Sequence, residues 1–198
     1  MSLRLLLLLA AVLGPVSTAS AQAKDSDSAN AVFLVAAPGL LDPNFRESVV
    51  LVTQAEDGSN VGFIVNRPGR LSLAQILPKN EVLKRFTEPL YLGGPVEGAG
   101  LFAVFRAKEN PPGALRVLDD VSFALDPAMV EKLLHAPPQR VRFFNGFAGW
   151  APGQLAAELE LGGWYALNAD AETVFRKDMD GLWEELLVRA RAVTAFLR

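Results

Sequence analysis

One block of glycines and aromatic residues, spanning residues 143–164, constrains the fold of this 198-residue chain more than any other segment. It reads Phe-Phe-Asn-Gly-Phe-Ala-Gly-Trp-Ala-Pro-Gly-Gln-Leu-Ala-Ala-Glu-Leu-Glu-Leu-Gly-Gly-Trp. Gly146, Gly149 and Gly153 predict a backbone that bends through conformations glycine adopts at low cost. The large rings beside them predict close packing over that backbone. We interpret the block as an architectural element.

The first 21 residues have the pattern of an export signal. Arg4 precedes an apolar run over residues 5–13, and Ala19-Ser20-Ala21 fits the small-residue pattern that signal peptidase cleaves. The run is much shorter than the about 20 apolar residues of a membrane-spanning helix. We therefore predict a signal peptide over 1–21 cleaved before Gln22, a flexible lead-in over 22–30, and one domain over 31–198 without a transmembrane helix. The predicted location is the periplasm, with the cytoplasm as the alternative.

Composition excludes several kinds of chemistry. The chain has no cysteine, so it can form neither disulfides nor thiolate zinc sites. It has 19 basic and 22 acidic residues, a net charge of −3, and no dense cluster of lysine and arginine. A mildly acidic surface argues against nucleic acid as the main partner. We expect no cofactor and, as partner, a small ligand or a protein that the sequence does not identify; the oligomeric state also stays open.

Catalytic and metal-binding patterns are missing from the sequence as well. The single histidine, His135, falls at the predicted end of a helix, where a surface or capping role explains it. The chain has no Gly-x-Ser-x-Gly elbow for a serine nucleophile, and its loop acids lack the spacing of a calcium loop. Residues 93–100 match neither phosphate-binding glycine pattern and are predicted to form a tight turn. We therefore predict no catalytic residue and no metal site.

Hydrophobic periodicity and turn residues predict an α+β fold with a curved, largely antiparallel sheet. The predicted strands are 31–37, 48–53, 60–65, 90–92, 101–106, 116–125 with a turn or bulge at 119–120, 140–144 and 164–167. The predicted helices are 71–77, 127–135 capped by Asp126, one starting at Pro152, a turn over 171–175, and a final helix capped by Asp180. The final helix is expected to present Trp183, Leu186, Leu187, Ala190, Val193 and Leu197 on one side.

Four motifs, in order and in register, resemble the YqgE/AlgH family of bacterial proteins. They are Ala37-Pro-Gly-Leu-Leu-Asp-Pro-Asn-Phe45, Gly62-Phe-Ile-Val-Asn-Arg-Pro68, Gly93-Gly-Pro-Val96, and Gly146 to Leu155 with Glu158 and Trp164. The resemblance implies a bifurcated sheet that closes into a pseudo-barrel with flanking helices. It implies no established activity, although some members carry a transcriptional-regulator label. The chain departs from the family near Gln54 and at Phe105, where many members have histidines, and this departure weakens any case for histidine chemistry.

These observations favour a non-catalytic binding or structural module. The candidate ligand-binding residues are Asn66, Arg67, Gly93, Gly94, Trp150, Gln154 and Glu158. Asn66 and Arg67 place an amide and a planar cation at a strand end, where a small anion could be bound.

A structural role is the alternative for the same residues. In that interpretation, Asn66 hydrogen-bonds within its own turn and Arg67 pairs with Glu97 or Glu158. Gln154 and Glu158 hydrogen-bond back to the glycine loop. Two further functions stay open. One is an enzyme that uses Arg67 and a carboxylate such as Glu158 or Asp42; the other is a transcriptional regulator, which the export signal and the acidic charge disfavour.

Overall fold

The computed structural model describes residues 31–196 of the chain. The predicted signal peptide, the predicted lead-in and Leu197 lie outside the described residues. Within 31–196, no helix has both the length and the apolar character needed to cross a membrane.

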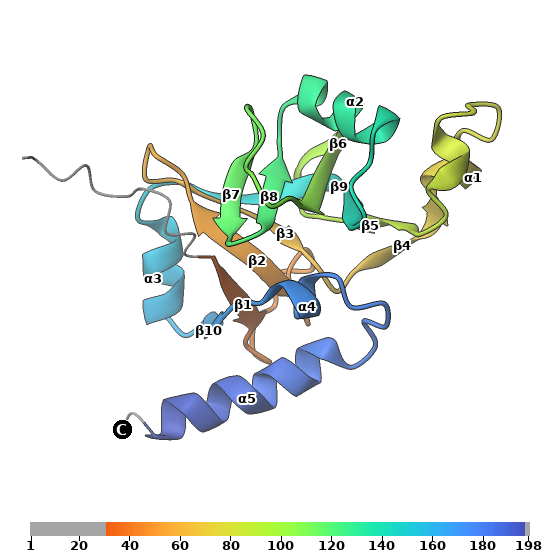
Figure 1. The fold of residues 1–198 in the computed structure, drawn as a ribbon. Coiled ribbons are helices and arrows are strands. Elements are labelled where there is room, and N and C mark those ends of the chain that lie inside the picture. The colour runs from red at the N-terminus through yellow and green to blue at the C-terminus, as the bar shows by residue number, and fades with distance from the viewer. Residues whose placement is uncertain (1–30, 197–198) are drawn as a thin grey trace, which may run out of the picture.

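Within this range ten strands form a curled sheet, and six helices flank it (Figure 1). The strands are β1 (Val32–Ala36), β2 (Val49–Gln54), β3 (Asn60–Ile64), β4 (Pro68–Ser72), β5 (Pro89–Leu92), β6 (Val96–Arg106), β7 (Leu115–Leu118), β8 (Val121–Ala124), β9 (Val141–Trp150) and β10 (Trp164–Asn168). Eight of them follow the order β10-β1-β2-β3-β9-β6-β8-β7, and every neighbouring pair in it is antiparallel. The predicted α+β class is confirmed.

The sheet branches at β9. Along one edge of β9, residues 148–150 pair with β3, whereas Phe144 and Asn145 pair in parallel with Tyr91 and Leu92 of β5. Along its other edge, β9 pairs with β6. β4 pairs only with β5, so β4 and β5 form a side branch, which extends away from the other strands in Figure 1.

β7, the last strand of the order, approaches the start of β1. The backbone N–H of Ala31, just before β1, donates to the carbonyl of Val117 in β7 at 3.1 Å. This contact brings the last strand of the order next to the start of the chain's first strand. The sheet therefore curls into a half-barrel, as the family resemblance implied.

The helices cover different parts of the sheet. They are α1 (Leu73–Ile76), η1 (Leu83–Arg85), α2 (Pro127–His135), α3 (Gln154–Glu160), α4 (Ala171–Val174) and α5 (Leu182–Phe196). α5 lies along β1 and β10, and the Trp183 indole donates to the Ala36 carbonyl at 2.8 Å. α2 packs on β6 and β8, and the Asp126 carboxylate accepts from Ala128 and Met129 in its first turn. The predicted cap of α2 is confirmed.

The central strands are buried on both faces, which explains their continuous apolar runs. In β1, Phe33 and Val35 belong to the core beneath α5, whereas Leu34 and Ala36 belong to a second core beneath α3. A third core lies beneath α2 and includes Phe143, the neighbour of Phe144 in the first core. Successive residues of a strand point to opposite faces, so one unbroken apolar run can supply two cores.

Several predicted boundaries were wrong. β6 begins at Val96, so residues 96–100 form the irregular first part of a strand rather than a tight turn, with Glu97 at φ 47°. Residues 116–125 contain a hairpin of two strands, β7 and β8, with the predicted turn at 119–120. β9 continues to Trp150 instead of ending at Phe144, because the bend at Gly146, with φ 67°, lies within the strand.

Other differences concern the elements around the sheet. α3 begins at Gln154 rather than at Pro152, and its N-cap is Gly153 with φ 81°. The short strand β4 and the 3₁₀ turn η1 were not predicted. In α5 the side chain of Val193 is 49% exposed, so the buried side of this helix does not extend to that residue.

Candidate functional site

Gly93 and Gly94 lie where two segments of backbone cross. The N–H of Gly93 donates to the carbonyl of Asn145 in β9, and its carbonyl accepts from Ile64 at the end of β3, both at 2.9 Å. A Cβ added to Gly93 would lie 2.3 Å from the carbonyl oxygen of Gly146. A Cβ added to Gly94 would lie 2.3 Å from the carbonyl of Phe147. The Gly-Gly-Pro-Val motif and the glycine block are therefore the two sides of one crossing.

Asn66 and Arg67 hold the segment before β2. The side-chain oxygen of Asn66 accepts from Val49 at 2.8 Å, and its amide donates to the Glu47 carbonyl at 3.0 Å. The Arg67 guanidinium donates to the carbonyls of Asn44 at 2.5 Å and of Arg46 at 3.1 Å. These four bonds attach the segment before β2 to the residues that follow β3.

The predicted pairing of Arg67 with Glu97 or Glu158 was wrong. Among the described residues, Arg67 forms no ion pair with Glu97 or Glu158, and Asn66 bonds to the neighbouring loop rather than to its own turn. Burial lowers the pKa of the Arg67 guanidinium, and the charge of Arg46 lowers it further. The backbone carbonyls replace the water that this partly buried cation loses.

Glu158 joins the two halves of the aromatic motif. Its Oε2 accepts from the Nε1 of Trp150 at 3.0 Å and from the Nε1 of Trp164 at 2.9 Å, and its Oε1 accepts from the Gln154 amide at 2.9 Å. Both indole side chains are 4% exposed, and Phe45 packs on both rings, with centroids 5.8 and 5.5 Å away. The predicted return of Gln154 to the glycine loop is confirmed, since its side-chain oxygen accepts from the Ala151 N–H at 3.1 Å.

The seven candidate residues thus make contacts that hold the fold, and a ligand-binding role for them stays a prediction. In the described residues, Arg67 forms no ion pair with Asp42 or Glu158, so the pair required by the enzyme alternative does not form. His135 is exposed on the last turn of α2. In residues 31–196, no three acidic or histidine side chains gather in a way that could hold a metal ion.

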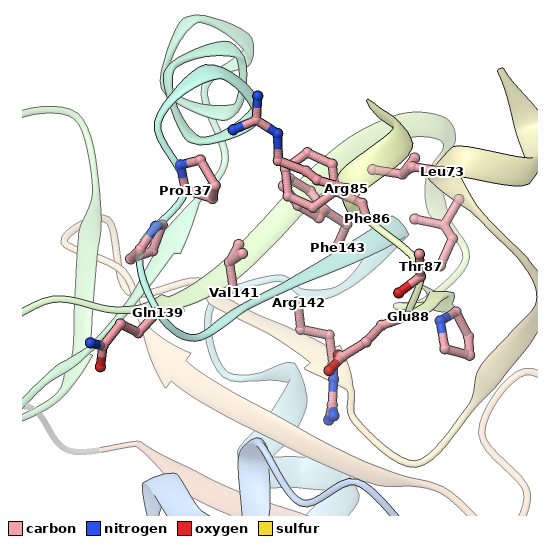
Figure 2. Close-up of a pocket in the computed structure, with 13 residues that line it drawn as sticks. Leu73, Arg85, Phe86, Thr87, Glu88, Pro137, Gln139, Val141, Arg142 and Phe143 are labelled. Atoms are coloured by element: carbon pink, nitrogen blue, oxygen red, sulfur yellow. The ribbon is translucent and has the colours of Figure 1, made fainter. Parts of the chain in front are cut away.

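The structure contains a pocket that the sequence did not predict, with a volume of about 310 Å³. We call it the β5–β9 pocket, because it lies between the segment entering β5 and the segment entering β9 (Figure 2). It is lined by Leu73, Arg85, Phe86, Thr87, Glu88, Pro89, Leu90, Pro137, Pro138, Gln139, Val141, Arg142 and Phe143. Phe86 and Phe143 meet edge to face, with ring centroids 5.0 Å apart. None of the seven candidate residues lines this pocket.

Arg142 is the unusual residue of the pocket lining. Its side chain is 3% exposed, and it donates to the carbonyls of Val174 at 2.6 Å and Arg176 at 3.0 Å. The guanidinium carbon lies 4.3 Å from the centre of the Tyr91 ring. Among the described residues, its Nε is buried and has no hydrogen-bond partner.

Two neighbouring side chains partly offset the effect of burial on Arg142. Burial lowers the pKa of Arg142, and Tyr91 and, to a smaller extent, Glu88 oppose that effect. Figure 2 shows the Glu88 side chain pointing toward Arg142. Within the described part of the chain, however, Glu88 forms no hydrogen bond or ion pair with Arg142. The sequence signal that could have drawn attention here is an arginine within the apolar run Val-Arg-Phe-Phe.

Comparisons with known proteins agree with the geometry. A family model described as AlgH-like matches residues 33–193. A UPF0301 protein of Thermobifida fusca is 37% identical over 187 residues, covering 87% of this chain and 92% of that protein. A UPF0301 protein of Chlorobaculum tepidum is 32% identical over 153 residues, covering 76% and 80% of the two chains.

Solved structures share the fold as well. The solution structure of the AlgH protein from Pseudomonas aeruginosa aligns with a TM-score of 0.64 at 26% identity, covering 86% of this chain and 90% of that one. A crystal structure of a Corynebacterium diphtheriae protein aligns with a TM-score of 0.65 at 25% identity, covering 81% and 86%. Together with the family match over residues 33–193, these likenesses show that the chain belongs to the AlgH-like family.

Proposed function

We propose that the protein is a non-catalytic binding module and that the β5–β9 pocket is its ligand site. The observation that carries the proposal is a pocket of about 310 Å³ that combines aromatic and aliphatic walls with several polar side chains. Small-molecule sites have this composition, with a few polar groups placed in a largely apolar concavity. By contrast, the polar atoms of Asn66, Arg67 and Glu158 are already engaged in bonds that hold the fold.

The proposal is tested by titrating small amphiphilic compounds into isotope-labelled protein and following the backbone amide resonances. We expect the shifted resonances to cluster at residues 85–90 and 137–143. The side chain of Val141 lies between Pro137 and Phe143 in the lining (Figure 2), so Val141→Trp should fill the pocket and abolish the shifts, whereas Val141→Ala should retain them. Shifts that cluster instead at Asn66, Arg67 and Glu158 would move the site to the residues predicted from the sequence.

The non-catalytic part of the proposal has its own test. A broad turnover screen on the purified protein should find no robust activity. An activity that Arg67→Ala abolishes would overturn this part and restore the enzyme alternative.

We also propose that the protein is exported to the periplasm. The support is the pattern of residues 1–21, namely Arg4, the apolar run and Ala19-Ser20-Ala21. Cell fractionation with N-terminal sequencing tests it, and the expected mature chain starts at Gln22. A cytoplasmic protein that still begins at Met1 would refute it.

A further inference from the structure

We infer that residues 70–85, which we call the tip, bind the surface of an anionic phospholipid membrane. The inference does not depend on the proposed ligand pocket. The tip contains the end of β4, α1, the connection that follows α1, and η1. In Figure 1, α1 and the loop after it project from the curled sheet at the end of the side branch of β4 and β5. The tip is therefore placed to meet a flat surface ahead of the rest of the domain.

The tip exposes three aliphatic side chains that are close together in the chain. Leu71, Ile76 and Leu77 are 52%, 43% and 53% exposed. Ser72 forms a capping box at the start of α1, which puts Leu71 and Ile76 at the two positions that often pack together across such a cap. Exposed aliphatic side chains that gather in this way are typical of surfaces that meet a partner or a membrane.

The tip is basic although the chain as a whole is acidic. It contains Arg70, Lys79, Lys84 and Arg85 but only one acid, Glu81, so its net charge is +3. The whole chain has a net charge of −3, which leaves −6 for all other residues. Glu81 is paired with Lys84 at 2.6 Å, and within residues 31–196 the other three cations form no ion pair. An anionic surface therefore attracts the tip and repels the rest of the domain, which orients the protein.

The edge of β4 argues against an added protein strand as the occupant. β4 pairs only with β5, so in the described part of the chain its other edge has no strand beside it. However, β4 has only five residues, begins with Pro68 and contains the charged Arg70, and these features protect a sheet edge from a further strand. Aliphatic side chains flanked by cations instead suit a lipid surface, where the apolar groups enter the headgroup boundary and the cations stay at the anionic phosphates.

The test measures how the purified protein partitions onto lipid vesicles of two compositions. One composition is phosphatidylcholine alone, and the other is equal parts of phosphatidylcholine and phosphatidylglycerol. We expect partitioning onto the anionic vesicles to be about tenfold stronger, and most of this difference should disappear at high salt, because salt screens exposed charges. Residues 1–21 are the same in every variant, so ratios between variants report on the substituted positions.

Two pairs of aliphatic residues separate the tip from exposed leucines elsewhere. The double substitution Ile76→Ser with Leu77→Ser should weaken partitioning onto the anionic vesicles at least fivefold, because it removes the apolar groups that insert. Leu41→Ser with Leu161→Ser is the matched control, since these two leucines are 88% and 87% exposed and lie outside the tip. This control should leave partitioning unchanged within about twofold.

The charge of the tip has a separate test. Lys79→Gln should weaken partitioning onto the anionic vesicles about fivefold and leave partitioning onto the neutral vesicles unchanged. Lys108→Gln removes an exposed lysine outside the tip and should have a smaller effect on both. All the substituted side chains are exposed, so urea unfolding should show the same stability for every variant.

Four results would overturn the inference. Equal partitioning onto the two compositions, or none onto either, would refute an anionic membrane as the partner. An equal loss in the control with Leu41 and Leu161 would place the contact outside the tip. Binding to poly-L-glutamate that depends on Lys79, without binding to vesicles, would indicate an acidic protein partner instead. A wild-type oligomer that the double substitution at Ile76 and Leu77 dissociates in sedimentation velocity would show that the tip contacts a second copy of the chain.

Discussion

Replacing Glu158 by alanine should destabilise the protein by about 2–4 kcal/mol. The carboxylate is the acceptor for two indole N–H groups of tryptophans that are each 4% exposed. A hydrogen bond to a charged group contributes about 1.5–3 kcal/mol, and a partly buried acceptor puts each bond near the lower end. The bond to the exposed Gln154 adds little, and the higher helix propensity of alanine offsets a few tenths of a kcal/mol.

Urea unfolding followed by far-ultraviolet circular dichroism measures this loss. Glu160→Ala is the matched control, because Glu160 lies on the same helix and is exposed, and it should change stability by less than about 0.5 kcal/mol. Glu158→Gln keeps one oxygen but loses the charge, so it should fall between the two, at about 1–2 kcal/mol. The slope of free energy against urea should stay constant across the series. A loss for Glu158→Ala below about 1 kcal/mol, no larger than the control, would refute the view that this carboxylate holds the aromatic motif together.

Three further changes test the structural account. Trp150→Ala should cost about 3–5 kcal/mol in the same unfolding assay, since it leaves a cavity in the core beneath α3; a cost under about 1 kcal/mol would mean that the ring is solvated. Gly93→Ala should cost about 3 kcal/mol or prevent folding, because its Cβ would meet the Gly146 carbonyl, whereas Gly98→Ala, which has open space, should be tolerated; equal effects would contradict the backbone crossing. Asn66→Ala should cost about 1–3 kcal/mol and speed proteolysis of the adjoining loop, and a protein as stable and as resistant as wild type would show that its two bonds do not hold that loop.

Much of the sheet could be predicted because its strands are apolar on both faces. The runs that form β1, β2 and β3 are mostly apolar and bounded by turn residues, so their pattern and length are sufficient to predict them. β4 was missed because Pro68-Gly-Arg-Leu-Ser has no alternating pattern and pairs only with β5. The glycines after Gly94 predict a turn, but they lie in a strand whose register is irregular, where glycines also occur.

The site was harder to predict than the fold for a physical reason. The sequence shows that Asn66 and Arg67 are polar groups at a strand end, but their partners are backbone carbonyls and one backbone N–H, groups that almost every residue has. The β5–β9 pocket is formed by two connections about 50 residues apart in the chain, and only the parallel pairing of β5 with β9 brings them together. No local pattern records such a pairing, so the arginine within the apolar run Val-Arg-Phe-Phe marks an unusual position without identifying its partners.

The branching of the sheet at β9 has a consequence for how the protein opens. β9 is hydrogen-bonded to β3 and β5 along one edge and to β6 along the other, so both of its edges are paired. We therefore expect the amide protons of β9 to exchange with solvent only through global unfolding. The side branch of β4 and β5 borders β9 only near Phe144, so β4 should exchange faster and open as a separate local unit.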